Sequence, residues 1–392
     1  MRRIALWAIP ALRRAPYGLV AALVLVRFAD EWTTFFPAGA LEPIRHDLRL
    51  TYAEAAGVLV ALPAGGLVGT LFTIAADYVS RRLLASLGAL TYGLAMIAFG
   101  VGHSLPVLLA AAFAWGAASD AFVHGAEVAL VDLAGDDLPK ALARMNAWAS
   151  VGDLAAPLTL GLVAALGFGW RGAFLGGGAA MLGYAAWLAS QPLPPPHAPK
   201  TLPNPFAGVW AILKDRRVLA LALVLGLFGL LDEPLAGFLI AYMERVRGLP
   251  PALATAPVMA ILIGGMGGYA AFERLAGERP ARTVIGWAAA AVALALPATL
   301  FAPWLAAQMA AGLVFGAAGA VFYTTLDSLA LGLRPGQAGA TSAVVGLVGM
   351  LGMAFPALVG AVADAWGLAA GVGLYAAIPV AILALVALEA RR

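Results

Sequence analysis

The sequence WGAASDAFVHGAE at residues 115–127 is matched two hundred positions later by FGAAGAVFYTTLD at residues 315–327. Glu127 falls on Asp327 in this alignment, and small residues share most of the other places. Further matches keep the same order and nearly the same offset. They pair Asp30 and Glu31 with Asp232 and Glu233, the run Pro63–Gly66 with Gly264 and Gly265, and Pro157 and Gly161 with Pro356 and Gly360. The two halves are therefore predicted to be parallel copies of one unit.

The composition indicates that these units lie in a membrane. Of the 392 residues, 62% are hydrophobic and 11% are charged, whereas a soluble domain has roughly 25% charged residues. The apolar runs reach the length of about 20 residues that a bilayer-spanning helix needs, and they are rich in glycine and alanine. We therefore expect an all-α membrane protein. Cysteine is absent, so the chain offers neither a disulfide nor a thiolate metal site.

The apolar runs predict twelve transmembrane helices in two six-helix bundles. The predicted domains are 1–190, a linker at 191–217, and 218–392. The proline cluster QPLPPPHAPK makes the start of the linker non-helical, and a short surface helix is expected from about Phe206. The first sixteen residues are expected to form an interfacial segment. The predicted spans are 17–43, 53–76, 83–103, 104–133, 142–168, 170–190, 218–242, 251–272, 283–303, 304–333, 338–365 and 367–388.

The distribution of lysine and arginine predicts the orientation in the membrane. Eighteen of the 24 basic residues lie on the side of the two termini and the linker, five lie on the other side, and Arg27 lies within a span. The positive-inside rule then makes both termini and the linker cytoplasmic. Because topology explains the net charge of +3, we expect no nucleic-acid partner. A monomer in the lipid bilayer of the cytoplasmic (inner) membrane is predicted.

The loop TIAADYVSRR at 73–82 resembles the signature G-x-x-x-D-R-x-G-R-R of the major facilitator superfamily. It retains Asp77, Arg81 and Arg82, whereas Thr73 and Ser80 replace glycines and Tyr78 replaces the first arginine. Glu273 and Arg274 occupy similar places in the second half, and the connections at 129–144 and 167–174 also look like those of the family. The fifth span, with AAPLTLG around Pro157, keeps part of the antiporter signature. The chain thus resembles drug/proton antiporter-like members.

This resemblance implies a working cycle by alternating access. Spans 1, 4, 7 and 10 would line a central cavity, substrate would bind near the midplane, and the two halves would rock. The signature residues would latch one state by charge contacts; the alternative for Arg81 and Arg82 is that they serve topology alone. The latch candidates are Asp77, Arg81, Arg82, Glu273 and Arg274.

Ten titratable residues lie at membrane depth, and eight of them are acids. A charge at the bilayer centre costs from about 2.5 to more than 10 kcal/mol, so these groups must be paired, protonated or functional. Eight acids cannot all be ionised beside one arginine, so some are expected to take up and release protons. Seven of the eight lie on the first, fourth, seventh and tenth spans. The ten residues are Arg27, Asp30, Glu31, Asp120, His124, Glu127, Asp153, Asp232, Glu233 and Asp327.

The spacing places several of these side chains together. Asp120, His124 and Glu127 share one helix face, because they are four and three residues apart. Arg27 can bond Asp30 or Glu31 along its own helix, which leaves the other acid for a partner, a substrate or a proton. Tyr323 and Asp327 likewise share a face of the tenth span.

Several of these residues have alternative roles. Asp232 and Glu233 act in coupling, or they cap and kink the helix around Pro234; Asp153 is expected to bond backbone groups freed by Pro157. His124 is a proton relay beside Glu127 or a neutral histidine that bonds a carboxylate. Asp120, His124 and Glu127 are metal-ligand types without diagnostic spacing, so no metal site is predicted. Trp32, Trp115, Phe322 and Tyr323 are candidate walls for an organic cation, or they serve packing.

These observations predict a proton-coupled secondary transporter that exports a cationic or amphipathic small organic molecule. Protons are the expected coupling ion, and no cofactor is expected. The alternatives are a divalent metal exporter, a zwitterionic nutrient importer and a lysolipid flippase. The scarcity of basic residues in the spans argues against phosphate esters and dicarboxylates, although Arg27 could serve a monoanion or zwitterion. The chain has no G-x-x-x-x-G-K-S/T loop for ATP and no assembled catalytic group, so neither a primary pump nor an enzyme is predicted.

Overall fold

A computed structural model describes residues 15–75, 80–134, 138–194, 212–275, 280–333 and 338–390. All regular secondary structure in these ranges is helical, and ten helical segments in them are long and apolar enough to cross a membrane. The predicted surface helix from about Phe206 begins outside the described residues. The all-α membrane fold is confirmed.

The chain divides into two compact units. Unit 1 contains Met1–Leu50 and Gly57–Thr201, and unit 2 contains Thr51–Ala56 and Leu202–Arg392. The helices of the first half are α1 (Tyr17–Val24), α2 (Val26–Thr34), α3 (Phe36–Gly39), α4 (Leu41–Leu48), α5 (Tyr52–Ala75), α6 (Arg81–Val101), α7 (Leu105–Ala134), α8 (Leu138–Ala165) and α9 (Gly169–Ser190). Those of the second half are α11 (Arg216–Gly229), α12 (Glu233–Arg245), α13 (Pro251–Ala254), α14 (Ala256–Leu275), α15 (Ala281–Phe301), α16 (Leu305–Gly332), α17 (Ala338–Gly349), the 3-10 turn η4 (Met350–Gly352), α18 (Phe355–Trp366) and α19 (Leu368–Ala390).

Four of the predicted spans are interrupted helices; the seventh (α11 and α12) and the eighth (α13 and α14) still meet a test of length and hydropathy across their breaks, whereas the first and the eleventh do not. The first span consists of α1 to α4, with interruptions at Leu25, Phe35 and Ala40, and the eleventh consists of α17, η4 and α18. These two spans account for the difference between the twelve predicted spans and the ten segments that meet the test. The twelve predicted spans correspond in order to the helices of the structure.

Local sequence signals set several helix starts. Thr51 and Glu54 form a capping box at the start of α5: the Thr51 backbone N–H donates to Glu54 Oε2 at 2.8 Å, and the Glu54 N–H donates to Thr51 Oγ1 at 3.1 Å. At the start of α11, the backbone N–H of Arg217 donates to Asp215 Oδ1 at 3.0 Å. These bonds satisfy N–H groups that have no partner within the helix.

In unit 1, α5 and α7 cross in direct backbone contact. A Cβ atom on Gly65 would collide with the carbonyl oxygen of Phe113, and one on Gly116 would collide with that of Leu62. Only glycine permits this approach, because any side chain would force the helices apart.

Unit 2 repeats this crossing with α14 and α16. A Cβ atom on Gly264 would collide with the carbonyl oxygen of Leu313, and one on Gly316 with that of Ile261. These four residues follow their counterparts in unit 1 by 199 or 200 positions, as numbering of the sequence shows. The internal repeat therefore appears as the same backbone contact in both units.

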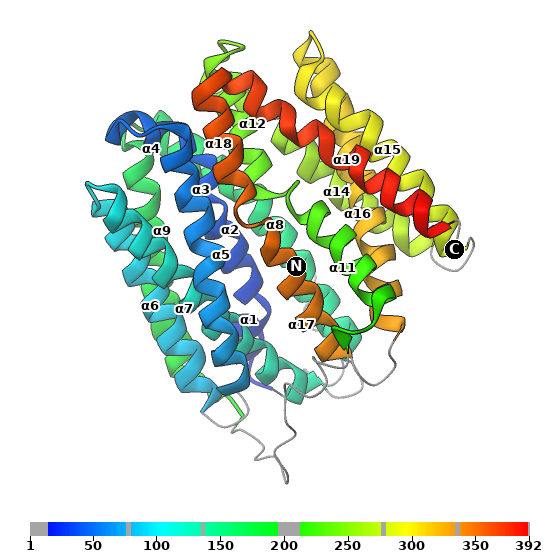
Figure 1. Cartoon of the computed structure of the whole chain (residues 1–392). Coiled ribbons are helices and arrows are strands. Elements are labelled where there is room, and N and C mark those ends of the chain that lie inside the picture. Colours follow the sequence, from blue (N-terminus) through cyan, green and yellow to red (C-terminus); the bar gives the residue numbers. More distant parts are fainter. Residues whose placement is uncertain are drawn as a thin grey trace, which may run out of the picture. The chain divides into compact units, whose positions relative to one another are not determined.

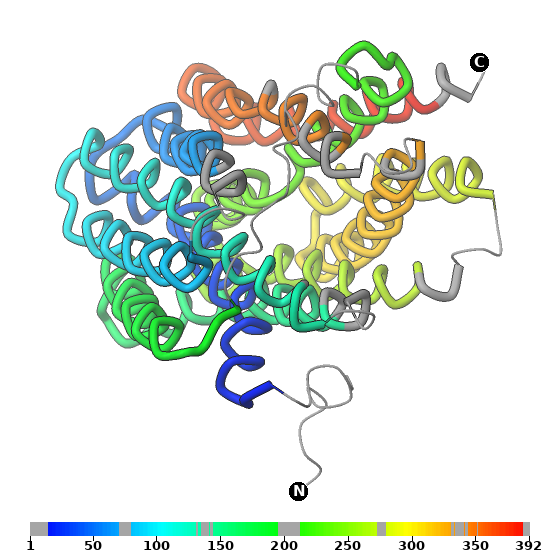
Figure 2. The backbone as a smooth tube through the Cα atoms, turned by 90° about the horizontal axis from the view of Figure 1, so that it is seen from below, coloured from blue at the N-terminus to red at the C-terminus, as the bar shows by residue number. Residues whose placement is uncertain are grey.

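The remaining helix pairs follow the same plan. α6 packs against α7 and α9, and α15 packs against α16 and α19 (Figure 1). α2 packs against α8, and α11 packs against α17. The yellow-to-orange part of the tube in Figure 2 shows α15 beside α16 from a second direction. Each of these helix pairs lies within one unit.

In each unit, an arginine side chain donates to carbonyl groups at the end of a helix: α6 in unit 1 and α15 in unit 2. Arg171 Nη1 donates to the carbonyl oxygens of Gly100 and Gly102 at 2.8 and 2.6 Å, where α6 ends. Arg247 Nη1 donates to the carbonyl oxygen of Ala302 at 3.1 Å, where α15 ends. Gly102 and Ala302 are separated by 200 positions, although Arg171 lies in α9 and Arg247 lies in the turn after α12. Both units thus satisfy carbonyl groups that a helix end leaves unpaired.

The glycine crossings give a direct test of packing. Gly116→Ala and Gly316→Ala are each expected to destabilise the protein by about 1–3 kcal/mol, because the new methyl group overpacks a backbone contact. The measurement is the apparent unfolding temperature in detergent, followed by tryptophan fluorescence. Gly286→Ala in α15 is the matched control, because a Cβ atom there meets nothing within 4 Å. Equal unfolding temperatures for all three variants would contradict the close crossing.

Candidate functional site

Three charged residues of the first span, Arg27, Asp30 and Glu31, lie on the short helix α2, between the interruptions at Leu25 and Phe35. Before α2, the Tyr184 hydroxyl of α9 donates to the backbone carbonyl of Ala22. Near the end of α2, the Thr33 and Thr34 hydroxyls donate to the carbonyl oxygens of Ala29 and Asp30, at 2.8 and 2.9 Å. Such back-bonds bend helices. The Tyr184 bond therefore holds α1, and the back-bonds mark the end of α2, so that α1 and α2 are separate pieces of the first span.

Arg27 bonds a carboxylate of another helix. Its Nε donates to Glu127 Oε1 on α7 at 2.8 Å, and its Nη2 lies 2.7 Å from the same oxygen. Glu31 is farther away, with its Oε1 3.7 Å from Arg27 Nη1. The side chains of Arg27, Glu31 and Glu127 are 31%, 26% and 20% exposed. The predicted bond along the helix is thus the longer contact, and the principal partner comes from the fourth span.

Asp30 occupies a different environment from its neighbour Glu31. Only 7% of Asp30 is exposed, and its Oδ1 accepts a hydrogen bond from Ser119 Oγ of α7 at 2.6 Å. The hydroxyl of the fully buried Tyr92, from α6, donates to the backbone carbonyl of Asp30 at 3.3 Å and lies 2.6 Å from the Thr33 hydroxyl. The sequence analysis identified neither Ser119 nor Tyr92. The only sequence signal for Ser119 was its position next to Asp120.

The polar face of α7 completes this group. Asp120 and His124 are half-buried, and His124 Nδ1 lies 3.0 Å from the backbone carbonyl of Asp120. The Asp120 carboxyl lies within electrostatic range of Asp30, Arg27, His124 and Glu127. Glu127 and Glu31 therefore contact the guanidinium of Arg27, and Asp30 and Asp120 lie within electrostatic range of it. We call this group the α2–α7 acid cluster: Arg27, Asp30, Glu31, Asp120 and Glu127.

An aromatic face lies beside the cluster. Phe28 stacks on Trp32 with 6.3 Å between ring centroids, and Trp148 of α8 meets Phe28 edge-on at 6.1 Å. Trp32 is half-buried, and its indole N–H donates to Thr159 Oγ1 at 2.8 Å. Trp115, in contrast, is fully buried among other rings, so it packs the core of unit 1 instead of forming a wall.

Unit 2 has a smaller acidic site at the matching places. Asp232 is exposed and lies immediately before α12, and Asp327 of α16 is half-buried. Tyr323 is 41% exposed and within electrostatic range of both carboxyl groups. Phe322 is fully buried against Phe228, with 5.3 Å between centroids, and so serves packing. Glu233 is half-buried at the first position of α12.

The basic residues of unit 2 are placed differently from Arg27. Within the part of unit 2 that the structure describes with side chains, every lysine and arginine lies near a helix end. They are Lys214, Arg216, Arg217, Arg245, Arg247 and Arg282. Gly229, which aligns with Arg27 at the offset of Asp232 from Asp30, provides no charge.

The latch candidates are only partly described. Arg81 is 4% exposed and forms an ion pair with Asp132 of α7. Arg82 is exposed. Asp77 lies outside the described residues, as do the side chains of Glu273 and Arg274. Asp153, which was expected to serve structure, is half-buried in α8.

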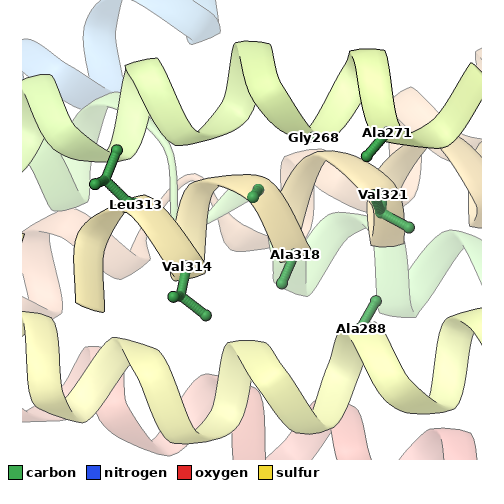
Figure 3. Close-up of a pocket in the computed structure, with 8 residues that line it drawn as sticks. Gly268, Ala271, Ala288, Leu313, Val314, Ala318 and Val321 are labelled. Carbon is green, nitrogen blue, oxygen red and sulfur yellow. The ribbon is translucent and has the colours of Figure 1, made fainter. Parts of the chain in front are cut away.

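Neither metal ligands nor polar pockets add a further site in the described ranges. No group of three or more histidine or acidic residues there is arranged to hold a metal ion. A shallow groove of about 400 Å³ between α14, α15 and α16 is lined by glycine, alanine, valine and leucine only (Figure 3). A second cavity, of about 370 Å³, is walled by apolar residues of α11, α17, η4 and α18. No candidate residue lines either space, so the acid cluster is the principal candidate site.

A duplicated set of membrane helices that holds carboxyl groups within each unit is typical of secondary transporters. Consistent with this class, the family model described as Major Facilitator Superfamily matches residues 20–357. The chain belongs to this family, and it is a multi-pass membrane transporter by membership. Proteins of this family are generally not enzymes.

Solved structures show the same fold at low sequence identity. A bacterial homolog of the human lysosomal transporter Spinster, inward-facing and unoccupied, is 17% identical with a TM-score of 0.74, covering 96% of this chain and 97% of that one. The nucleoside transporter NupG, as a mutant, is 14% identical with a TM-score of 0.77 and coverages of 94% and 99%. A POT family transporter in complex with 5-aminolevulinic acid is 13% identical with a TM-score of 0.72 and coverages of 94% and 95%. No curated protein matches the chain.

The ion pair between Arg27 and Glu127 can be tested by a double-mutant cycle. Arg27→Gln and Glu127→Gln are each expected to lower the apparent unfolding temperature, because each leaves an opposite charge without its main partner. The double variant is expected to lose less stability than the two single variants lose together, which corresponds to a coupling energy of about 1–3 kcal/mol. Arg27→Gln combined with Asp215→Asn, which changes the cap of α11 in unit 2, provides the additive control. If the effects on stability add in both cycles, the contact between Arg27 and Glu127 contributes nothing to stability.

Proposed function

We propose that this protein is a proton-coupled secondary active transporter that exports a cationic or amphipathic small organic molecule by alternating access. The observation that carries the proposal is the α2–α7 acid cluster, in which two carboxyl groups contact one guanidinium and two more lie within electrostatic range of it. The same residues serve as the proton-coupling and substrate-binding groups. A monomer in the cytoplasmic membrane is the proposed setting.

Charge balance links protons to a cationic cargo. With all four carboxyl groups ionised, the cluster would carry four negative charges and one positive charge. Charges held away from bulk water need compensation, which a bound cation or bound protons can provide. Because both neutralise the same carboxylates, they compete for the site. Such competition is the physical basis of antiport, since release of protons and binding of cargo then alternate.

The surroundings of the charges support an organic cation. Phe28, Trp32 and Trp148 present aromatic rings next to the helix turn that carries Arg27 and Glu31. In unit 2, Tyr323 stands within electrostatic range of Asp232 and Asp327. Aromatic faces with carboxylates attract cations through the ring quadrupole and through charge. An amphipathic cation would satisfy both features.

A zwitterionic nutrient importer is the second candidate, and Arg27 favours it. Its guanidinium is 31% exposed beside the carboxylate of Glu31, so the two could bind opposite ends of a zwitterion. The similar POT family structure contains 5-aminolevulinic acid. The other two alternatives, a divalent metal exporter and a lysolipid flippase, have no comparable contact in the part of the chain that the structure describes with side chains.

Transport in proteoliposomes tests the proposal. An outwardly directed cation flux is expected to require a counterflow of protons, detected with a pH-sensitive dye trapped in the vesicles. The variants Asp30→Asn, Glu31→Gln, Asp120→Asn and Glu127→Gln keep side-chain shape, and at least one is expected to reduce proton counterflow at least about tenfold. Asp215→Asn, which keeps an acceptor for the cap of α11, is the control. Unchanged coupling in all four variants, or cargo flux without proton flux, would rule the proposal out.

Arg27→Gln separates the two candidate functions. For export of cations it is expected to leave cargo affinity unchanged or improved, because a positive charge is removed. For a zwitterion it is expected to raise KM by about tenfold or more, since the anionic end loses a charge-assisted bond. The measurement compares KM for one cation and one zwitterion in the same vesicles. A loss for the zwitterion alone would favour the importer.

A further inference from the structure

The carboxyl groups of the acid cluster have different partners. Glu127 bonds Arg27 at 2.7–2.8 Å, and Glu31 lies 3.7 Å from the same guanidinium. Asp30 is nearly covered, and its carboxyl bonds a neutral hydroxyl, Ser119 Oγ, at 2.6 Å. The bond between Arg27 and Glu127 is therefore ionic and partly exposed. The bond between Asp30 and Ser119 is to a neutral hydroxyl, and Asp30 is buried.

This difference decides how each group tolerates a proton. A serine hydroxyl is both a donor and an acceptor, and its hydrogen rotates. It can donate to an Asp30 carboxylate, and it can accept from Asp30 once that group is protonated, without displacement of a heavy atom. The guanidinium of Arg27 has donors only, so its bond to Glu127 weakens when Glu127 is protonated. Asp30 thus keeps an equivalent hydrogen bond in both protonation states, whereas the bond between Glu127 and Arg27 is weakened when Glu127 takes up a proton.

The position of Asp30 is fixed from three helices. α2 carries Asp30, α7 supplies Ser119, and α6 supplies Tyr92, whose hydroxyl bonds the Asp30 carbonyl and contacts Thr33. A buried network of this kind holds its members rigidly when each is satisfied. The charged and titratable groups around Asp30 are Arg27 and Glu31 on α2, Tyr92 on α6, and Asp120, His124 and Glu127 on α7, with the half-buried Asp153 on the adjacent α8.

We infer that Ser119 is a positioning residue for proton exchange: its hydroxyl bonds Asp30 in both protonation states and makes Asp30 the proton-carrying carboxyl group. Glu31 and Glu127, together with Arg27, then contact the cargo. The inference rests on the proposed function for its role in coupling. The hydrogen-bond geometry on which it stands is independent of the cargo.

The first test measures proton binding without transport. Infrared difference spectra of the purified protein, recorded on acidification, are expected to contain a carbonyl stretch of a newly protonated carboxyl group. Asp30→Asn is expected to remove this band, and Ser119→Ala is expected to shift its frequency, since the hydrogen bond is lost. Ser119→Thr retains a hydroxyl and is expected to restore it. A band that persists in Asp30→Asn and disappears in Glu127→Gln would overturn the inference.

The second test uses the pH profile of transport. Ser119→Ala is expected to move the midpoint of the profile by about half to one pH unit towards higher pH, because the lost bond is stronger to the carboxylate than to the acid. KM for cargo is expected to stay within about twofold. Glu31→Gln is expected to change KM for cargo and to leave the midpoint of the pH profile unchanged. Ser150→Ala is the matched control, since that hydroxyl bonds only the Asn146 carbonyl of its own helix, at 3.5 Å.

The two tests separate the two proposals. An unchanged profile in Ser119→Ala, with proton-coupled transport intact, overturns the inference and leaves the proposed function standing. Absence of proton-coupled transport in the unaltered protein overturns the proposed function. In that case the infrared band still decides whether Asp30 with Ser119 is the group that binds the proton.

Discussion

The ion pair between Arg27 and Glu127 joins the first and fourth spans at a depth where neither charge is stable alone. Removing a charged group from water costs several kcal/mol, which a partner must offset. One guanidinium cannot offset four carboxylates, so unit 1 retains an excess of acid. The interrupted first span meets the same requirement, because Tyr184 bonds α1 and Tyr92 bonds α2, and α2 presents Arg27 and Asp30 to α7. The site is thus a consequence of incomplete charge compensation.

The two units share a scaffold and differ in chemistry. The close crossings at Gly116 and Gly316 repeat almost atom for atom, because backbone contact leaves room for glycine alone. Charge does not repeat in this way: Gly229 stands where Arg27 would fall, and the helix is interrupted just before Glu233. Duplication therefore preserved the packing constraint and let the polar groups diverge. An asymmetric site can arise within a symmetric frame for this reason.

Much of the fold was predictable from the sequence, and the bonding within the site was not. Hydropathy gave the spans, and the offset of 200 between Gly116 and Gly316 reflects a contact that both units contain. The partner of Arg27 was predicted within its own helix, since spacing along one helix is all that a single sequence reveals. To predict Glu127 as the partner of Arg27, one must know how α7 is rotated about its axis relative to α2. Tertiary packing sets that rotation. Ser119 was missed for the same reason, and a serine among small residues carries no signal by itself.

Adjacent acids can take separate roles because a helix turns by about 100° per residue. Asp30 therefore points to α6 and α7, where Ser119 and Tyr92 lie, whereas the Cβ of Glu31 faces Gly152 on α8. The absence of a side chain at Gly152 lets α8 approach α2 closely at Glu31, whose Oε1 lies 3.7 Å from Arg27 Nη1. Exchanging the two residues would place the longer acid in the buried position beside Ser119. The order Asp-Glu, with the shorter acid on the more tightly packed face, is the arrangement that the space beside α7 accommodates.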